Sequence, residues 1–259
     1  MTFDDIRKFK HCASKEERKQ KFGVALISIL LWPIFIVVLA LVVFFSYGLA
    51  LIIFLINWMF AEYHVRKIQA VGVSVSSDQF PEIWEAAESV RERFQIHNPP
   101  HIIILAHGEL NAFAVRIARK RLIILFSELL EGIIDQPAEL RALLAHEMCH
   151  HSLDFGWSRR ILELYKPAKF RSARELTCDN ASLVAAQDID AAKSLLRKLS
   201  VGTKLHTRVS DPALVDEAIH INSGFYGWLL RQYLSHPPVG ARISNLDRFA
   251  NRNTGLKER

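Results

Sequence analysis

The stretch LLAHEMCHH, residues 143–151, places two histidines four positions apart with a glutamate directly after the first. Positions i and i+4 share one face of an α-helix, so the side chains of His146 and His150 can bind the same ion. Glu147 projects beside them, where it can hold a water molecule on that ion. The pattern is the H-E-x-x-H signature of a zinc site that hydrolyses peptide bonds. The alternative is a helix that happens to be rich in histidine.

The residues before this stretch predict the helix that the signature requires. Asp135 suits the N-terminal cap, and Pro137 suits the first turn. His151 points about 100° around the helix from His150, so we expect it to stay away from the ion. A helical stripe of apolar residues supports the prediction: Leu140, Leu143, Leu144 and Met148.

A catalytic zinc ion keeps three protein ligands and an open position, so a third ligand is required. The metzincin pattern would place a glycine and a histidine at the positions of Leu153 and Gly156, which excludes it. The later stretch SARELTCDNASL, residues 172–183, offers Glu175 and Asp179 on one helical face. Glu175 would complete a His-His-Glu site, and Asp179 would orient a ligand histidine or a nearby cation. The competing interpretation of this acidic pair is a solvated helix face.

An apolar run from Val24 to Phe60 contains no charged residue. About 20 helical residues cross the hydrocarbon core of a bilayer, and this run is nearly twice that long. We therefore predict a transmembrane hairpin over residues 23–63, with spans at 23–43 and 47–63. The turn is expected near Gly48, which adopts backbone conformations that other residues avoid. A signal peptide or a buried core helix explains the length less well.

The charges that flank this run predict its orientation. Residues 1–22 carry seven basic side chains, and Arg66 and Lys67 follow the second span. The turn is uncharged, so the positive-inside bias places both ends of the hairpin, and the bulk of the protein, in the cytoplasm. A single span would place that bulk outside. The net charge of +6 fits contact with anionic lipid, and no basic stripe indicates a nucleic-acid partner.

Residues 64–250 predict a single α+β domain after a basic cytoplasmic segment at 1–22 and the transmembrane hairpin. Short apolar runs predict a small meandering sheet over 101–106, 111–117 and 121–127. Beyond the signature, helices are predicted at 171–187, at 188–201 and around 213–234, with a flexible tail at 251–259.

The cysteines number three and have no regular spacing: Cys12, Cys149 and Cys178. An odd number without spacing argues against a disulfide framework. We expect small buried thiols in a reducing compartment.

Several motifs in order give the chain a family resemblance. Besides H-E-x-x-H and R-E-L-x-x-D, they are NAFAV (111–115), SELLEGIIDQPAELRALLAHEMCH (127–150) and HPPVGARISNL (236–246). Over roughly residues 78–248 the chain resembles the HtpX-like and CAAX-prenyl-protease-like integral-membrane zinc endopeptidases, the gluzincins of metallopeptidase family forty-eight. The resemblance implies a mostly helical, zincin-type peptidase domain that holds one zinc ion per chain.

The resemblance also implies roles for single residues. Glu147 would act as general base. His236 would donate to the oxyanion, and the alternative interpretation of that residue is a His-Pro turn. Arg242 would pair with Asp179 rather than lie on the surface. The strand with Asn111, Ala112, Phe113 and Ala114 would bind the substrate backbone as an added strand.

The chain departs from HtpX-type members after the zinc helix. The interval HSLDFGWSRRILELYKPAKFRSAR, residues 151–174, is too charged to cross a membrane. Apolar residues within it could contact a membrane only peripherally: Trp157, Ile161, Leu162, Leu164 and Tyr165. A deep chamber enclosed by the membrane, and with it a CAAX substrate, is therefore not expected.

Three functional hypotheses follow. The first is a membrane-anchored zinc endopeptidase of membrane-protein quality control or processing, with protein or peptide substrates and the lipid bilayer as partners. The second is a catalytically silent, membrane-bound binding or adaptor protein that retains the zinc fold. The third is a soluble metallohydrolase with a cleaved leader. The sequence predicts no oligomeric state.

Overall fold

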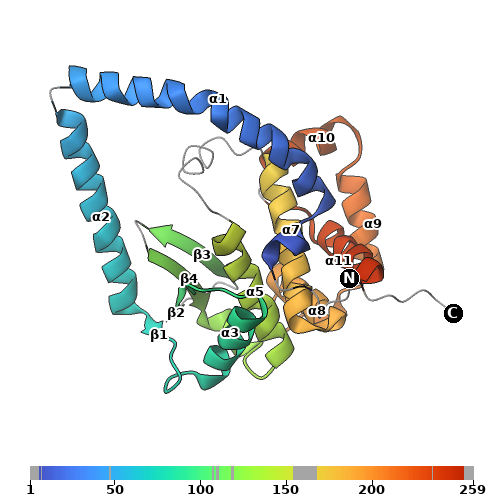
Figure 1. Cartoon of the computed structure of the whole chain (residues 1–259). Coiled ribbons are helices and arrows are strands. Elements are labelled where there is room, and N and C mark those ends of the chain that lie inside the picture. The colour runs from blue at the N-terminus through green and yellow to red at the C-terminus, as the bar shows by residue number, and fades with distance from the viewer. Residues whose placement is uncertain are drawn as a thin grey trace.

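The structure is a computed structural model of the whole chain (Figure 1). It describes residues 6, 8–46, 48–106, 108, 111–117, 120–153, 168–234 and 236–253. The predicted contact residues between 157 and 165 and the end of the tail, 254–259, lie outside the described residues.

Four strands form one sheet in the order β1-β2-β4-β3. Their bounds are β1 Val73–Ser74, β2 His101–Leu105, β3 Ala112–Ile117 and β4 Lys120–Phe126. The three apolar runs are confirmed as strands, but the predicted meander is wrong, because β2 pairs with β4 in parallel and β3 lies at the edge. Strand β4 takes the inner place because its residues 122–126 are all buried, as a strand covered on both faces requires.

The helices of the domain lie mainly on the side of the sheet that faces the helix with H-E-x-x-H (Figure 1). They are α3 Pro81–Arg93, α4 Ser127–Glu131, α5 Pro137–Leu153, α7 Ala168–Ala186, α8 Ile189–Val201, α9 Asp211–Ile221, α10 Gly224–Tyr233 and α11 Val239–Asn253. Short 3₁₀ helices are η2 Phe9–Cys12 and η3 His206–Arg208. The α+β class is confirmed.

Helix α5 is the centre of the domain. Figure 1 shows it beside α7, with the sheet on its other side and α8 close to its base. Leu140, Leu144 and Cys149 on α5 are fully buried. The helix begins at Pro137, as expected, but the carbonyl of Gln136 accepts the first hydrogen bond, so Gln136 rather than Asp135 takes the cap position.

Two predicted boundaries differ from the structure. The helix expected around 213–234 is divided into α9 and α10, because the chain turns at Asn222 and Ser223 and Gly224 has a φ of 66°. Helix α11 continues to Asn253, three residues past the predicted end of the domain at residue 250, and Asn253 donates to the carbonyl of Phe249 at 2.7 Å.

The long apolar run forms helices α1, Lys15–Phe45, and α2, Leu49–Val71. They separate at the predicted turn, where Gly48 has a φ of 90°, and then diverge (Figure 1). Among the described residues, α2 is the one helix long and apolar enough to cross a membrane, and the apolar part of α1, Ile29–Phe45, is shorter. The large apolar side chains of both segments are mostly exposed. The two-span hairpin stays a prediction.

Helix α2 runs past the predicted end of the second span at residue 63. It passes through Arg66 and Lys67 and ends before Gly72. Glu62 accepts a hydrogen bond from Lys120 at 2.9 Å, which ties the foot of α2 to the sheet.

The N-terminal residues, predicted as a separate basic segment, lie partly in the core of the domain. Ile6, Phe9 and Cys12 are buried, and the ring of Phe9 stacks on that of Phe94 at 4.1 Å. The segment before α1 is therefore built into the domain that carries the signature.

Candidate metal centre

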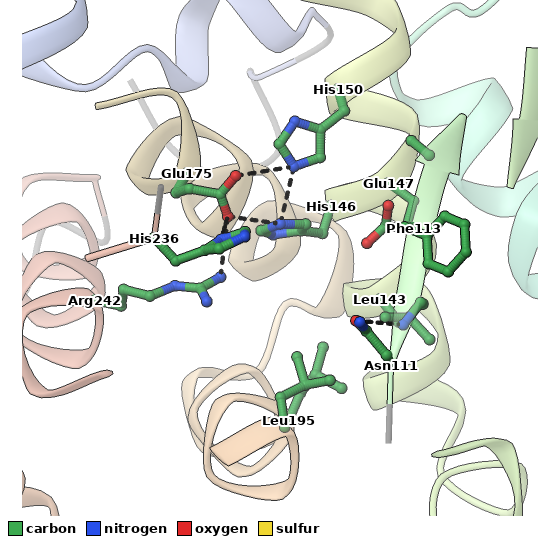
Figure 2. Close-up of a pocket in the computed structure, with 13 residues that line it drawn as sticks. Asn111, Phe113, Leu143, His146, Glu147, His150, Glu175, Leu195, His236 and Arg242 are labelled. Atoms are coloured by element: carbon green, nitrogen blue, oxygen red, sulfur yellow. Dashed lines mark hydrogen bonds and ion pairs between the residues drawn. The ribbon is translucent and has the colours of Figure 1, made fainter. Parts of the chain in front are cut away.

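Three elements bring the predicted site residues together (Figure 2). Helix α5 supplies His146, Glu147 and His150, and α7 supplies Glu175. His236 lies between α10 and α11. The i to i+4 spacing on α5 directs both imidazoles toward α7, which packs alongside it.

The side-chain atoms of this cluster have the spacing of metal ligands. Nε2 of His146 and Nε2 of His150 are 3.2 Å apart. The carboxylate of Glu175 lies 3.5 Å from the first of these atoms and 3.4 Å from the second. In a tetrahedral site with metal–ligand distances of about 2.0–2.1 Å, two ligand atoms lie roughly 3.3 Å apart. The three side chains therefore fit one small cation between them.

The carboxylate of Glu175 also lacks a well-formed partner. Its Oε2 atom is buried and makes no hydrogen bond of good geometry, although Nδ1 of His236 lies 2.9 Å away. Burial disfavours its charge, but His146 and His236 outweigh burial and hold the pKa of the carboxyl well below its usual range. An ionised, buried oxygen that points at two imidazoles is the arrangement that a metal ion completes.

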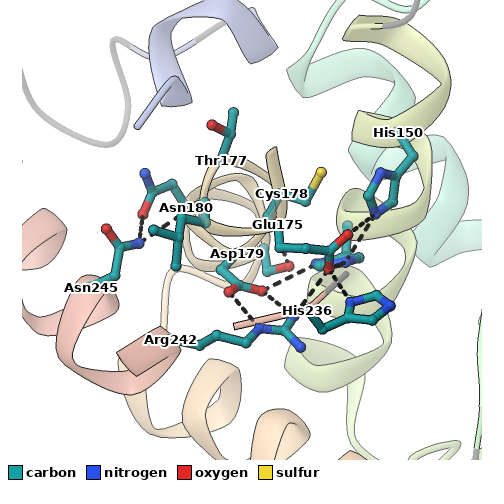
Figure 3. Close-up of polar contacts among 12 residues, drawn as sticks. His150, Glu175, Thr177, Cys178, Asp179, Asn180, His236, Arg242 and Asn245 are labelled. Atoms are coloured by element: carbon teal, nitrogen blue, oxygen red, sulfur yellow. Dashed lines mark hydrogen bonds and ion pairs between the residues drawn. The ribbon is translucent and has the colours of Figure 1, made fainter. Parts of the chain in front are cut away.

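A second carboxylate, that of Asp179 (Figure 3), fixes the ring of His146. Oδ1 of Asp179 lies 3.2 Å from Nδ1 of His146, which leaves Nε2 of that ring facing the cluster. Arg242 donates to both oxygens of Asp179, at 2.8 and 2.6 Å. Burial raises the pKa of Asp179, but the guanidinium of Arg242 outweighs it, so the net shift is downward. A carboxylate that orients a ligand histidine in this way sets its tautomer.

At neutral pH at most one of the two imidazoles carries the extra proton that makes it an imidazolium. Burial opposes protonation of His146, but hydrogen bonds to Asp179 and Glu175 raise its pKa to about 10. Burial and the neighbouring His146 lower the pKa of His150 to about 3. A cation between the rings would take the place of that proton, because metal ligands must be deprotonated.

Glu147 lies on the side of His146 that is away from Glu175, toward strand β3 (Figure 2). Its side chain is buried, and burial is the main cause of its raised pKa. A backbone hydrogen bond from Ala114 opposes that shift and ties the carboxylate to the strand.

A cavity of about 540 Å³ opens at this cluster. The four predicted residues of the β3 stretch line it, together with the cluster itself: Asn111, Ala112, Phe113 and Ala114. Apolar residues from α5 and α8 complete the wall, namely Leu143, Leu195 and Leu199. The sequence did not predict that these leucines line a cavity, because leucines at helical spacing cannot be distinguished from core residues.

Cys178 is a competing third ligand. Its sulfur lies within 4.8 Å of the ligand atoms of both His146 and His150. However, burial and the neighbouring Cys149 raise the pKa of the Cys178 thiol, and metals bind the thiolate. Glu175 is closer and ionised, so we regard it as the better ligand.

His151 points away from the cluster, as expected. Its side chain is buried, and its Nε2 atom lies 3.0 Å from the carbonyl of Leu122 on β4. All three cysteines are buried and none forms a disulfide, which confirms the expectation of buried thiols.

Comparison with known proteins gives two matches. Residues 77–163 match the model of peptidase family M48, a range that contains α5 and ends before α7. The plastoglobule-localized metallopeptidase 48, chloroplastic, of Arabidopsis thaliana is 28% identical over 218 residues, which cover 72% of this chain and 62% of the relative. The chain thus spans less than two thirds of that relative's length.

No solved structure gives a significant match. The family match covers the helix with H-E-x-x-H, and the match to the relative extends over most of the chain. Over residues 77–163 the chain is therefore similar to peptidase family M48.

Proposed function

We propose that the protein is a membrane-anchored, zinc-dependent endopeptidase. The observation that carries the proposal is the convergence of His146, His150 and Glu175 at tetrahedral spacing, with Glu147 beside them in an open cavity. Zinc is the metal that two imidazoles and one carboxylate favour in sites of this kind.

The roles of the residues follow from their positions. A zinc ion held by these three side chains would supply Lewis acidity to the scissile carbonyl and to a water molecule. Glu147 takes the proton of that water and passes it to the leaving amine. The hydrogen bond from Ala114 holds the Glu147 carboxylate toward the strand along which a substrate would lie.

His236 stands at the mouth of the cavity with 63% of its side chain exposed. Because Nδ1 faces Glu175, the imidazolium form presents Nε2–H for donation to the substrate oxyanion. Arg242 would act through Asp179 by holding it against His146 rather than by touching substrate.

Strand β3 supports a substrate-binding role for its residues. Among the described strands it pairs with β4 alone, so its other edge can accept an extended peptide. Main-chain hydrogen bonds do not distinguish one side chain from another, so we expect the enzyme to show weak preference for the sequence of its substrate. Suitable substrates are misfolded or damaged membrane proteins and flexible segments close to the bilayer.

The packing of the N-terminal residues supports a hairpin whose two ends lie on the same side of a membrane. Phe9 and Cys12 lie in the core of the same domain as the metal cluster, so both must be on one side of a membrane. The run formed by α1 and α2 then crosses the membrane twice or not at all, and its exposed apolar side chains favour two crossings. The name of the Arabidopsis relative gives a plastoglobule location for that protein, and the identity of the membrane that the hairpin crosses is left to experiment.

Metal removal tests the proposal. Purified full-length protein should cleave casein, lose this activity with a chelator and recover it with zinc. Retained cleavage in the chelator would contradict a metal-dependent mechanism. A protein that binds zinc and never cleaves would instead be the catalytically silent adaptor.

A further inference from the structure

Helix α7 has a second polar face opposite the one that carries Glu175 and Asp179. Figure 3 shows Thr177 and Asn180 pointing away from the metal cluster, Thr177 toward the N-terminal segment. Both side chains are fully buried. Buried polar groups need hydrogen-bond partners, and the partners here come from residues 12–17 and from α11.

The first set of contacts joins the start of α1 to α7. The backbone N–H of Ser14 donates to Oγ1 of Thr177 at 2.9 Å, and the Ser14 hydroxyl donates to the carbonyl of Ala173 at 2.9 Å. The Thr177 hydroxyl donates in turn to the carboxylate of Glu17. Arg174 lies 3.1 Å from the other oxygen of that carboxylate.

These contacts resemble a capping box at the start of α1, but Thr177 of α7 takes part in it. Ser14 caps α1 and accepts the N–H of Glu17 at 3.1 Å, as in the S-x-x-E motif. In that motif the glutamate accepts the N–H of the capping residue directly. Here the hydroxyl of Thr177 stands between the two groups, so the cap of α1 is complete only when α7 is in place.

The second set of contacts joins the same segment to α11. The amide of Asn180 donates to the carbonyl of Cys12 at 2.8 Å, and Asn245 on α11 donates to Asn180 at 2.8 Å. Helix α11 also carries Arg242, which holds Asp179. The rotation and translation of α7 are thus fixed from the face opposite the metal cluster.

We propose that Ser14, Glu17 and Thr177 are positioning residues for the metal site. Their hydrogen bonds, which we call the α7 lock, hold α7 so that Glu175 and Asp179 lie against His146 and His150. This inference rests on the proposed metal-binding role of these side chains. Ligand geometry tolerates errors of only about 0.5 Å, so loss of the lock weakens metal binding without touching a ligand. Because α1 continues from this lock into its apolar part, the lock also joins the proposed membrane anchor to the metal site.

The test compares two substitutions at one position in the full-length protein. Thr177→Val keeps the volume and removes the hydroxyl, whereas Thr177→Ser keeps the hydroxyl. Zinc affinity, measured by competition with a chromophoric chelator, should fall about tenfold in Thr177→Val and stay within about twofold in Thr177→Ser. Ile83→Val on α3, a core change far from α7 in sequence, controls for general loss of stability, which thermal unfolding of the metal-free protein measures.

Equal zinc affinity in Thr177→Val and the native protein would overturn the proposal, as would an equal loss in Ile83→Val. If Thr177→Val does not fold, Glu17→Gln and Ser14→Ala carry the same comparison, and unchanged affinity in both would overturn it. If the native protein binds no zinc, the proposed function fails rather than the positioning role alone.

Discussion

Glu175 and Cys178 compete for the third position beside His146 and His150. Both lie on α7 close to the two imidazoles, but the carboxylate is 3.4–3.5 Å from them and the thiol is protonated by burial. Of the two, only the carboxylate already carries the charge that a divalent cation requires.

Replacing each residue separately decides between them. Glu175→Gln should lower zinc affinity by at least about 100-fold, because a neutral amide is a poor zinc ligand. Cys178→Ala should leave zinc affinity within about twofold, since it removes a protonated thiol. Metal content after dialysis against a weak chelator measures both, and the reverse order of losses would assign the ligand role to Cys178.

Part of this site could be predicted from local sequence and part could not. The spacing of His146 and His150, and that of Glu175 and Asp179, already placed each pair on one helix face. The Ser14–Thr177 contact joins residues 163 positions apart, and the S-x-x-E motif predicts only the cap of α1. The partner of a buried hydroxyl depends on tertiary packing, which no periodicity in the sequence records.

Among the elements, β3 lies at the edge of the sheet next to the metal cluster. The strands themselves could be predicted from their apolar runs, but their order could not, because parallel pairing of β2 with β4 leaves the same runs in the sequence as a meander does. The edge position of β3 matters for function, because an inner strand could not accept a substrate strand.

Removing one donor from the outer edge of β3 should weaken substrate binding selectively. The N–H of Ala114 points to Glu147, and N–H groups alternate in direction along a strand, so that of Ala112 points the same way. It donates to Oδ1 of Asn111 at 2.9 Å, an acceptor that a substrate carbonyl would replace. Ala112→Pro removes this donor, which edge positions tolerate. We expect KM for casein to rise about tenfold, with kcat and zinc content nearly unchanged.

Ala112→Val, which keeps the N–H group, is the matched control and should behave like the native protein. If steady-state kinetics show the same KM for Ala112→Pro and Ala112→Val, substrate does not pair with this edge.

At the scale of the whole molecule, the N-terminal residues and the metal cluster belong to one packed domain. Ile6, Phe9 and Cys12 are buried in it, so no membrane can separate them from α5 and α7. Hydropathy alone left one or two spans open, because the uncharged run from Val24 to Phe60 can be divided into two spans or cross only once. The packing of the N-terminal residues requires that both ends of the apolar run lie on one side of the membrane, which the charge distribution could only suggest.

This constraint predicts the topology of the protein in a membrane. A tag at the N-terminus and one at the C-terminus should both be accessible from the same side, because two crossings return the chain to the side on which it began. The positive-inside bias predicts that this side is the cytoplasmic one. Protease protection of sealed vesicles of both orientations measures this. Protection of one tag alone would show an odd number of crossings and contradict the packing of the N-terminal segment.

We propose that Glu147 activates a water molecule on a metal held by His146, His150 and Glu175. Glu147→Gln keeps the shape of the side chain and removes its ability to accept a proton, and Glu131→Gln on the exposed end of α4 is the matched control. Zinc content and casein cleavage should be measured on the same purified preparations. We expect that Glu147→Gln keeps one zinc ion per chain and loses at least about 100-fold in cleavage rate, while Glu131→Gln retains both. Cleavage by zinc-loaded Glu147→Gln at the native rate would exclude this role of Glu147.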